Sequence, residues 1–574
     1  MMDKACKEFR RTVQATSLTG HLIIKKALYE RARNSYRLAF SFSGGDPLYL
    51  LKDVAFSKTG LFLDAGKGWR NTAMILSHKV HYLCIMDNSR RRLSFLKKFY
   101  VDKNTIFMLG NNLNMPFKEQ VDVLFLSNFL ISDRSSEKRK NKVTFLQEVR
   151  DALKANGVLA FRVRNKFNPF YSFKLPSVFE EKKSFYQECR KILRKAGFQA
   201  IRIFGCYPNH LFPMYTYSLE NTKAVRYLSE RIVNSRIDLI FFRIISKNIC
   251  LSRLLSPSFM VFAFKEKTGG RTDFVGDLVI GGSDVYAKYV KVINLNRNII
   301  TKVLRKKHFG NYFRKEVKIR NSFYTNAPKL ITYDESKGYL VEELIDGENL
   351  ESIYSKNPHK CLELVPKAFD ALMNYYRSQK CSHFTIYEYS VQLLRQLTEY
   401  QRKSLLKLYL EGFTGAYKQF IEKNYVKGRS MNNLMESEIP ILQIHGDFRF
   451  KNIMYSGTNP NIFLIDWDST RKASIYRDFF NLILCAPFDR DTAKDIINLE
   501  SRNNIGKVML DVLYDKYSDW GELNRYFMRA LTFICLAEDI LHILKLMLDN
   551  EVLYEAIEDV KEFEKKARSL NCVV

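Results

Sequence analysis

A short motif near the end of the chain constrains its fold most strongly. The sequence HGDFRFKN occupies residues 445–452, and IDWD follows at residues 465–468. Between them, residues 453–455 and 462–465 have the composition of two short strands, and the turn-forming sequence at 457–460 joins them. A hairpin returns the chain towards its starting point. We therefore expect the two halves of the motif to lie side by side.

Three polar side chains would then lie close together, and their functional groups suit phosphoryl transfer. Asp447 offers a carboxylate that can orient a hydroxyl nucleophile. Asn452 and Asp466 offer an amide and a second carboxylate that can hold Mg²⁺ on nucleotide phosphates. Phosphoryl transfer needs little covalent chemistry from a protein, because positioning and charge neutralisation supply most of the catalysis.

These residues resemble a known family. HGDFRFKNIM followed by IDWD is similar to the catalytic loop and metal-binding Asp of aminoglycoside phosphotransferases and choline kinases. The resemblance covers roughly residues 275–570. It implies an α+β bilobal protein-kinase-like domain, with an N-lobe at 272–349 and a C-lobe at 350–574, that uses ATP and Mg²⁺.

The resemblance also implies a role for each residue of the motif. Asp447 would be the catalytic base, and Asn452 and Asp466 would be the Mg²⁺ ligands. His445 would brace the loop, and Asp468 would be a supporting acid.

The upstream part of the kinase-like domain should hold ATP. Lys302 fits the strand lysine that contacts the phosphates, and Glu316 fits its helix partner. Backbone atoms near Glu343 and Leu344 would meet adenine. Four other lysines compete for the role of Lys302, namely Lys288, Lys291, Lys306 and Lys307. Only Gly281-Gly282-Ser283 marks the loop over the phosphates, which leaves an inactive kinase fold open.

The positive charge belongs to the other half of the chain. The net charge is +31, and residues 1–270 hold 48 Lys and Arg against 21 Asp and Glu. A field of this sign attracts anionic partners such as anionic lipid, phosphorylated glycan or nucleic acid. The charge changes at a turn-rich seam, residues 265–272, where we place the domain boundary. A helical extension is expected at 1–39 and a separate domain at 40–268.

This first half alternates strand-like and helical segments, which indicates a parallel α/β sheet. The expected strands are 61–64, 82–87, 121–126 and 158–163, and the expected helices are 71–78, 89–100 and 143–155. The second half begins with strands expected at 277–280, 287–293 and 298–304 and a helix at 312–322. The segment 223–253 interleaves Arg and Lys with Leu, Ile and Phe, as in helices that pack inward or lie on an anionic membrane surface.

A glycine-bearing turn follows the first of these strands. Asp64, Gly66 and Gly68 lie in the sequence LFLDAGKG, where backbone can approach a nucleotide-like ligand closely. About twenty residues later, Asp87 ends the next strand and can pair with ribose hydroxyls. A NAD-binding Rossmann domain would share both features.

Together with the later segments FMLGNNLNMPF, VDVLF and LQEVRDALKANGVLA, this pattern resembles class I S-adenosylmethionine-dependent methyltransferases. The resemblance covers about residues 40–265 and implies an α/β Rossmann-like methyltransferase domain. Asp64, Gly66 and Gly68 would line the methionine side of S-adenosyl-L-methionine, Asp87 the ribose and Asn111 the adenine.

We therefore expect a bifunctional transferase that phosphorylates and methylates a small-molecule or glycan hydroxyl acceptor, such as a lipid-linked sugar. The ten cysteines occur singly, which is typical of reduced thiols in a cytoplasmic protein. Contact with a membrane surface through the basic half is compatible with this location. Two alternatives remain open: an RNA methyltransferase with a regulatory kinase-like domain, and a catalytically inactive scaffold.

Overall fold

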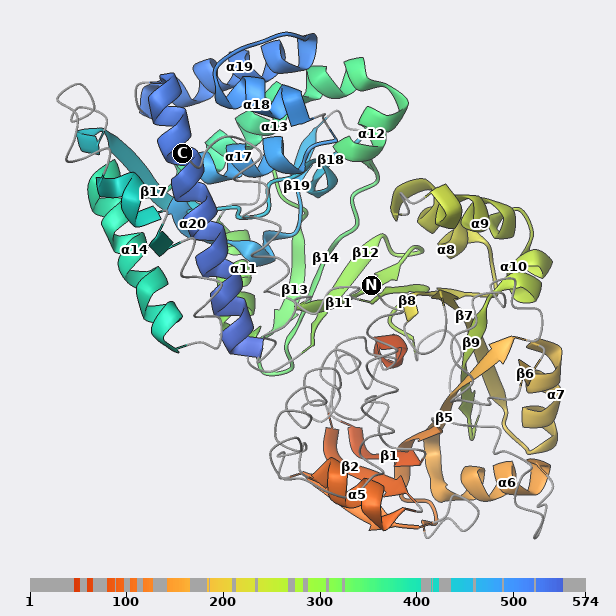
Figure 1. The fold of residues 1–574 in the computed structure, drawn as a ribbon. Helices are drawn as coiled ribbons and strands as arrows, with labels where there is room; N and C mark the ends of the chain where they lie inside the picture. The colour runs from red at the N-terminus through yellow and green to blue at the C-terminus, as the bar shows by residue number, and fades with distance from the viewer. Residues whose placement is uncertain are drawn as a thin grey trace, which may run out of the picture. The chain divides into compact units, whose positions relative to one another are not determined.

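The computed structural model of the chain separates into two compact units (Figure 1). The sheet unit is drawn from Tyr36–Phe313 and Leu330–Leu344, and the described residues of the helical unit come from Arg314–Lys329 and Ile345–Val574. The structure describes residues 46–51, 59–65, 80–87, 89–97, 104–110, 117–126, 142–165, 183–184, 186–208, 213–232, 236–266, 274–281, 288–305, 309–322, 326–403, 414–415, 417–422, 435–457, 461–487, 490–520 and 523–550.

One mixed sheet runs through the described part of the sheet unit, in the order β13-β14-β12-β11-β10-β8-β7-β9-β5-β4-β1-β2-β3, with β6 beside β5. Its strands are β1 Thr59–Ala65, β2 Val80–Asp87, β3 Thr105–Leu109, β4 Val121–Leu126, β5 Leu153–Asn165, β6 Lys183–Ser184, β7 Ala200–Pro208, β8 Pro213–Ser218, β9 Ser258–Phe264, β10 Leu278–Ile280, β11 Tyr289–Asn294, β12 Ile299–Leu304, β13 Leu330–Asp334 and β14 Tyr339–Glu343.

The first strands form a doubly wound parallel sheet. β3, β2, β1, β4 and β5 pair in parallel, and β9 then pairs antiparallel with both β5 and β7. An all-parallel Rossmann sheet of the NAD-binding type would lack the reversed strand. This strand order confirms the expected Rossmann-like methyltransferase fold.

The sheet continues across the seam at residues 265–272. Antiparallel pairing of β8 with β10 places Tyr217 opposite Leu278, and β11, β12, β14 and β13 follow as an antiparallel meander. These later strands are those expected for a kinase-like N-lobe. The short helix η1, Asp46–Leu50, packs in one apolar cluster with residues of β10 and β11. Asp46 also forms a buried salt bridge with Arg305, which follows β12.

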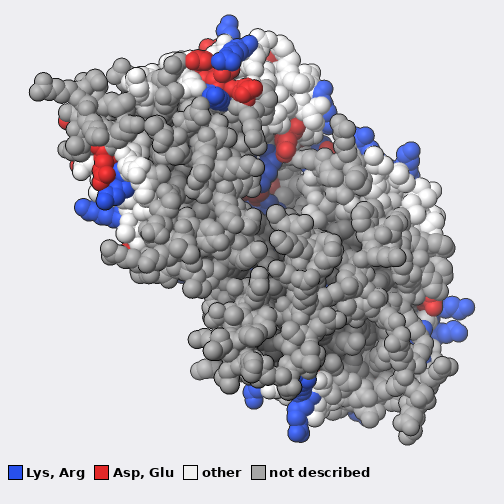
Figure 2. Space-filling view, in the orientation of Figure 1, with Lys and Arg blue, Asp and Glu red and all other residues white. Residues whose placement is uncertain are grey.

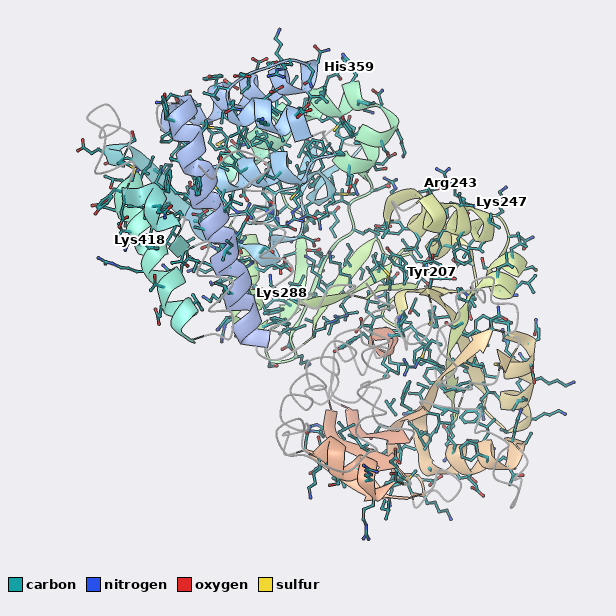
Figure 3. All side chains as sticks on the ribbon, in the orientation of Figure 1. Tyr207, Arg243, Lys247, Lys288, His359 and Lys418 are labelled. Atoms are coloured by element: carbon teal, nitrogen blue, oxygen red, sulfur yellow. The ribbon has the colours of Figure 1, made fainter. Side chains whose placement is uncertain are left out.

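The described helices of the sheet unit are α5 Arg90–Lys97, α6 Lys142–Ala152, α7 Tyr186–Lys195, α8 Lys223–Tyr227, the π-helical turn η3 Leu228–Ile232, α9 Arg236–Ser246 and α10 Ile249–Leu255. Basic side chains lie on the surface of the sheet unit over α8 and α9 (Figure 2). Arg243 and Lys247 lie on the outer side of α9, and Tyr207 lies on its inner side at the sheet (Figure 3). No helix in the described part of the chain has the length and apolar content needed to cross a membrane.

Most elements expected up to residue 344 have the observed type. The strand expected at 121–126 is β4 to the residue, and the helix expected at 312–322 is α11, Gly310–Ser322. The helix expected to reach residue 155 ends at Ala152, and β5 begins at once with Leu153. The reason is long-range: Leu153 pairs with Val121 at the start of β4. The helices expected at 1–39 and 71–78 lie outside the described residues.

The helical unit follows with two small sheets and a helical body, as expected for a kinase-like C-lobe. Its strands are β15 Glu348–Asn349, β16 Ser382–Thr385, β17 Glu438–Ile444, β18 Ile453–Tyr455, β19 Ile462–Leu464 and β20 Arg471–Ser474. Its main described helices are α11, α12 Leu350–Lys356, α13 Pro358–Arg377, α14 Ile386–Lys403, α17 Tyr476–Cys485, α18 Arg490–Ile497, α19 Asn504–Tyr517 and α20 Arg525–Asn550.

Buried charges tie α20 to the rest of this unit. Glu538 accepts hydrogen bonds from the Tyr389 hydroxyl of α14 at 2.7 Å and from the Ser474 backbone N–H at 2.8 Å. Its neighbour Asp539 pairs with Arg477 of α17. Burial raises the pKa of Glu538 to about 7, because the charged carboxylate loses its hydration inside the protein.

We predict that this carboxyl group makes stability depend on pH. The pKa of Glu538 is higher in the folded than in the unfolded state. Its contribution to the free energy of unfolding is therefore fully present below about pH 4.5 and is lost as the pH rises through about 7. Glu538→Gln should flatten the stability profile between these values by at most about 3.5 kcal/mol, at about 1.4 kcal/mol per pKa unit.

Urea unfolding of the full chain at several pH values measures this dependence. The control is Glu422→Gln, which alters an exposed carboxylate paired with Lys418. An unchanged pH slope in Glu538→Gln would contradict the prediction.

Candidate active site

The 445–468 motif folds as the sequence predicts. β18 and β19 pair antiparallel, with Ile453 opposite Leu464, and form the expected hairpin. The Ile465 backbone N–H donates to the Asn452 carbonyl at 2.9 Å. Asp466, the next residue, is thereby held at the end of the hairpin beside the segment that carries Asp447 and Asn452.

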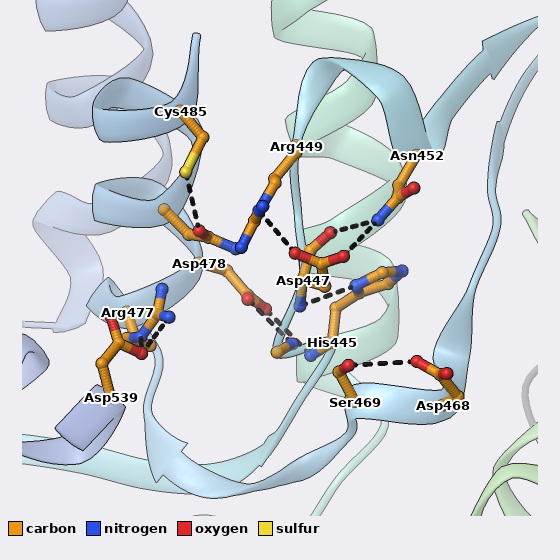
Figure 4. Close-up of polar contacts among 12 residues, drawn as sticks. His445, Asp447, Arg449, Asn452, Asp468, Ser469, Arg477, Asp478, Cys485 and Asp539 are labelled. Carbon is orange, nitrogen blue, oxygen red and sulfur yellow. Dashed lines mark hydrogen bonds and ion pairs between the residues drawn. The ribbon is translucent and has the colours of Figure 1, made fainter. Parts of the chain in front are cut away.

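Asp447 is held from two sides (Figure 4). The amide nitrogen of Asn452 donates to the backbone carbonyl and to Oδ2 of Asp447, both at 2.8 Å. Nε of Arg449 lies 2.5 Å from Oδ1 of Asp447. The carboxylate is therefore fixed in direction and close to a positive charge, while its side chain remains about 20% exposed.

The same contacts orient Asn452 for a cation. Since both of its partners on Asp447 are acceptors, the amide must present nitrogen to them, which turns its oxygen to the other side. Amide and carboxylate oxygens suit Mg²⁺, and Asn452 with Asp466 fits such a site. Among the described residues, no three His, Cys, Asp or Glu side chains are grouped to hold a metal.

Asp466 has a strained backbone. Its φ of 60° and ψ of 58° lie in the left-handed region, which residues other than glycine seldom adopt. Strain of this kind persists where surrounding contacts impose it, and it is common at functional sites. The residue begins η7, Trp467–Ser469, where Asp468 accepts a hydrogen bond from Ser469 at 3.0 Å.

His445 contacts both the loop and the hairpin. Its side chain is fully buried, and Nε2 lies 3.0 Å from the carbonyl of Ile465. Nδ1 accepts a hydrogen bond from the Asp447 backbone N–H at 3.3 Å, and the ring packs against Trp467 with 4.6 Å between centroids. This position connects the loop to the hairpin.

Asp478, on α17, was not predicted from the sequence and anchors the loop. Its carboxylate is buried and accepts from the backbone N–H groups of His445 at 2.8 Å and Gly446 at 2.9 Å. The Tyr376 hydroxyl donates a third hydrogen bond at 2.6 Å. Gly446 has a φ of 84°, and a Cβ there would lie 2.2 Å from the carbonyl oxygen of Ser469.

The residues expected to hold ATP belong to both units. Lys302, Glu343 and Leu344 lie in the sheet unit, and Glu316 lies in the helical unit. Lys302 is buried in β12 and pairs with Glu342 of β14 at 3.2 Å. Glu316, its expected partner, is buried on α11. Glu343 is exposed at the end of β14, and the Leu344 backbone N–H donates to the Asn298 carbonyl at 2.8 Å.

Two expected S-adenosylmethionine contacts lie at the carboxyl edge of the parallel strands. Asp64 is near the end of β1, and Asp87 ends the neighbouring β2. Asp87 is buried, and its Oδ1 accepts from the Ser89 backbone N–H at 2.8 Å. Gly66, Gly68 and Asn111 lie outside the described residues.

A cavity of about 520 Å³ lies at the opposite ends of these strands. His81 and Tyr82 near the start of β2 and Lys154 near the start of β5 contribute to its largely apolar lining. Doubly wound sheets bind ligands beyond the carboxyl ends of their strands. We therefore do not assign this cavity to the expected cofactor.

Comparisons with solved structures match the chain to a choline kinase and to methyltransferases. Choline kinase LicA from Streptococcus pneumoniae is 12% identical, with 51% of this chain and 91% of that chain covered and a TM-score of 0.34. A methyltransferase from Thermotoga maritima, a possible histamine N-methyltransferase, is 15% identical, with 42% and 99% covered and a TM-score of 0.27. Phosphoethanolamine N-methyltransferase 2 of Haemonchus contortus is 17% identical, with 42% and 58% covered and a TM-score of 0.27.

These structural similarities are low, so the fold assignments rest on the strand order and on the family match below. No curated protein matches the chain. The model of the phosphotransferase enzyme family, APH, matches residues 301–507, which include β12, the catalytic-loop motif and the hairpin. The C-terminal part of this chain therefore contains a domain of the phosphotransferase enzyme family.

Proposed function

We propose that the APH-type domain transfers the γ-phosphoryl group of ATP to a hydroxyl group. The observation that carries this proposal is the arrangement of Asp447, Asn452 and Asp466 on one loop and hairpin. The carboxylate of Asp447 is directed by Asn452 and Arg449. The backbone hydrogen bond between Ile465 and Asn452 holds Asp466 at the end of the hairpin next to this loop. The sequence match to a phosphotransferase family supports the same reaction.

The residues divide the work as follows. Asp447 accepts the proton of the acceptor hydroxyl. The hydroxyl oxygen then bonds to the γ-phosphorus as the bond between this phosphorus and the bridging oxygen of ADP breaks. Asn452 and Asp466 would hold Mg²⁺, which neutralises charge on the phosphates when bound. Arg449 lies close enough to Asp447 to compensate its charge before the acceptor binds.

For the first half of the chain we propose methyl transfer from S-adenosylmethionine. The doubly wound strand order and the two acidic residues at its carboxyl edge, Asp64 and Asp87, support this second activity. The acceptor is proposed to be a hydroxylated small molecule or a glycan end. The support for an anionic or lipid-linked acceptor is the basic character of residues 1–270.

Asp447→Asn should lower phosphoryl transfer from ATP at least about 100-fold, since positioned acid–base groups contribute about 10²–10⁴-fold. Transfer of labelled phosphate to a panel of glycans and amino alcohols measures the loss. The matched control is Asp511→Asn, which makes the same change at an exposed position on α19. Equal labelling by Asp447→Asn and the wild type would reject Asp447 as the base.

Asp478→Asn should also lower the rate of phosphoryl transfer. The amide NH₂ of Asn cannot accept a hydrogen bond, so it would face one of the backbone N–H groups of His445 and Gly446 without pairing. A loss of about 1–3 kcal/mol of stability is expected from the unsatisfied groups. If Asp478 positions the base, kcat falls at least about tenfold with KM for ATP nearly unchanged, and the double variant with Asp447→Asn is no slower than Asp447→Asn alone.

Tyr376→Phe serves as the companion variant, since it removes only the third hydrogen bond to Asp478. Its kcat should remain within a fewfold of the wild type. Additive losses in the double variant would show that Asp478 does not act through Asp447.

Ligand-induced thermal shifts test the two cofactors separately. S-adenosylmethionine and Mg-ATP should each raise Tm, because a ligand that binds only the folded state stabilises it. Asp87→Asn should weaken the first shift and leave the second unchanged. Absence of both shifts would favour the inactive scaffold, and absence of the first alone would remove methyl transfer from the proposal.

A further inference from the structure

The outer face of α9 carries a repeating pair of apolar and basic side chains. Ile240, Arg243, Ile244 and Lys247 recur at intervals of three and four residues, so they lie along one face of the helix and its C-terminal turn. All four are exposed, and the two isoleucines are 59% and 43% exposed. We call these four residues the α9 face.

Packing on the opposite side fixes this orientation. Phe241, Phe242 and Ile245 are buried, and the Tyr207 ring of β7 stacks on Phe241 with 4.9 Å between centroids. The Ser252 hydroxyl of α10 donates to the Ile245 carbonyl at 2.6 Å. The packing of α9 on the core therefore uses Phe241, Phe242 and Ile245, whereas Ile240 and Ile244 stay exposed on the opposite side.

The charge around the α9 face has one predominant sign. Among the described charged side chains of 223–254, Glu230 is acidic, whereas the basic ones are Lys223, Arg226, Arg231, Arg243, Lys247 and Arg253. Basic side chains lie on the surface over these helices in Figure 2, and Arg243 and Lys247 lie on the outer side of α9 in Figure 3. On the adjoining helix α10, Leu254 is a further exposed apolar residue, at 42%.

We propose that the α9 face docks on an anionic lipid surface. Isoleucines beside Arg and Lys match the boundary between acyl chains and phosphate headgroups, where apolar side chains insert and basic ones meet phosphate. Nucleic acid would use the basic residues and leave the two isoleucines in water. The inference goes beyond the proposed reactions and depends on neither, since it concerns where the protein lies.

Sedimentation of the full chain with vesicles tests the docking. One vesicle sample contains phosphatidylcholine alone, and the other contains about one third phosphatidylglycerol. We expect binding to the anionic vesicles only. Arg243→Gln with Lys247→Gln should lower the partition coefficient about 25-fold, at about fivefold per basic residue. Ile240→Asn with Ile244→Asn should lower it about tenfold.

Two matched controls come from other exposed positions in the sheet unit. Arg194→Gln with Lys195→Gln on α7 removes the same charge, and Ile331→Asn on β13 removes a similarly exposed isoleucine. Both should bind as the wild type does. Each substituted side chain is exposed, and an unchanged Tm in every variant excludes unfolding as the cause of lost binding.

Four results would overturn the proposal. The wild type could bind neutral and anionic vesicles equally, or the α9 variants could bind like the controls. The wild type could also fail to bind vesicles and instead form a dimer that Ile240→Asn with Ile244→Asn dissociates. The α9 face would then bind a second copy of the chain. Binding of single-stranded RNA that depends on Arg243 and Lys247, again without vesicle binding, would equally replace the lipid surface.

Discussion

The carboxylate of Asp478 is the point on which the candidate active site depends. It accepts hydrogen bonds from the backbone N–H groups of His445 and Gly446, so the loop at residues 445–452 is fixed from the buried helix α17. Unsatisfied backbone donors inside a protein are costly, and a carboxylate meets two of them at once. From this anchor His445 reaches Ile465, and the hairpin then brings Asp466 into place.

The sequence predicts the structure of the loop at residues 445–452 because the signals for it are local. The hairpin spans few residues and has strong turn signals, and its strands begin and end almost where expected. Asp478 was missed because it lies 33 residues from its partner on an apolar helix, where an aspartate has no motif around it. Arg449 was quoted with the motif, but its contact with Asp447 needs side-chain geometry that spacing does not give.

The same contrast separates the elements of the sheet unit. β4 is a run of apolar residues between polar ones, and its limits follow from composition. β3 was not expected as a strand, since its residues are only partly buried and show no clear alternation. At Ala152 a helix changes directly into β5, and only pairing with β4 decides the boundary. The positions expected for Gly66, Gly68 and Asn111 remain predictions.

The pairing of β8 with β10 has a consequence for the autonomy of the two halves. Although sequence and charge divide the chain near residue 270, main-chain hydrogen bonds join Tyr215–Tyr217 to Leu278–Ile280. Separating the halves would turn β8 and β10 into open sheet edges with unpaired N–H and C=O groups, which promote aggregation. Each half therefore covers a sheet edge of the other, and we expect either half to aggregate when it is produced alone.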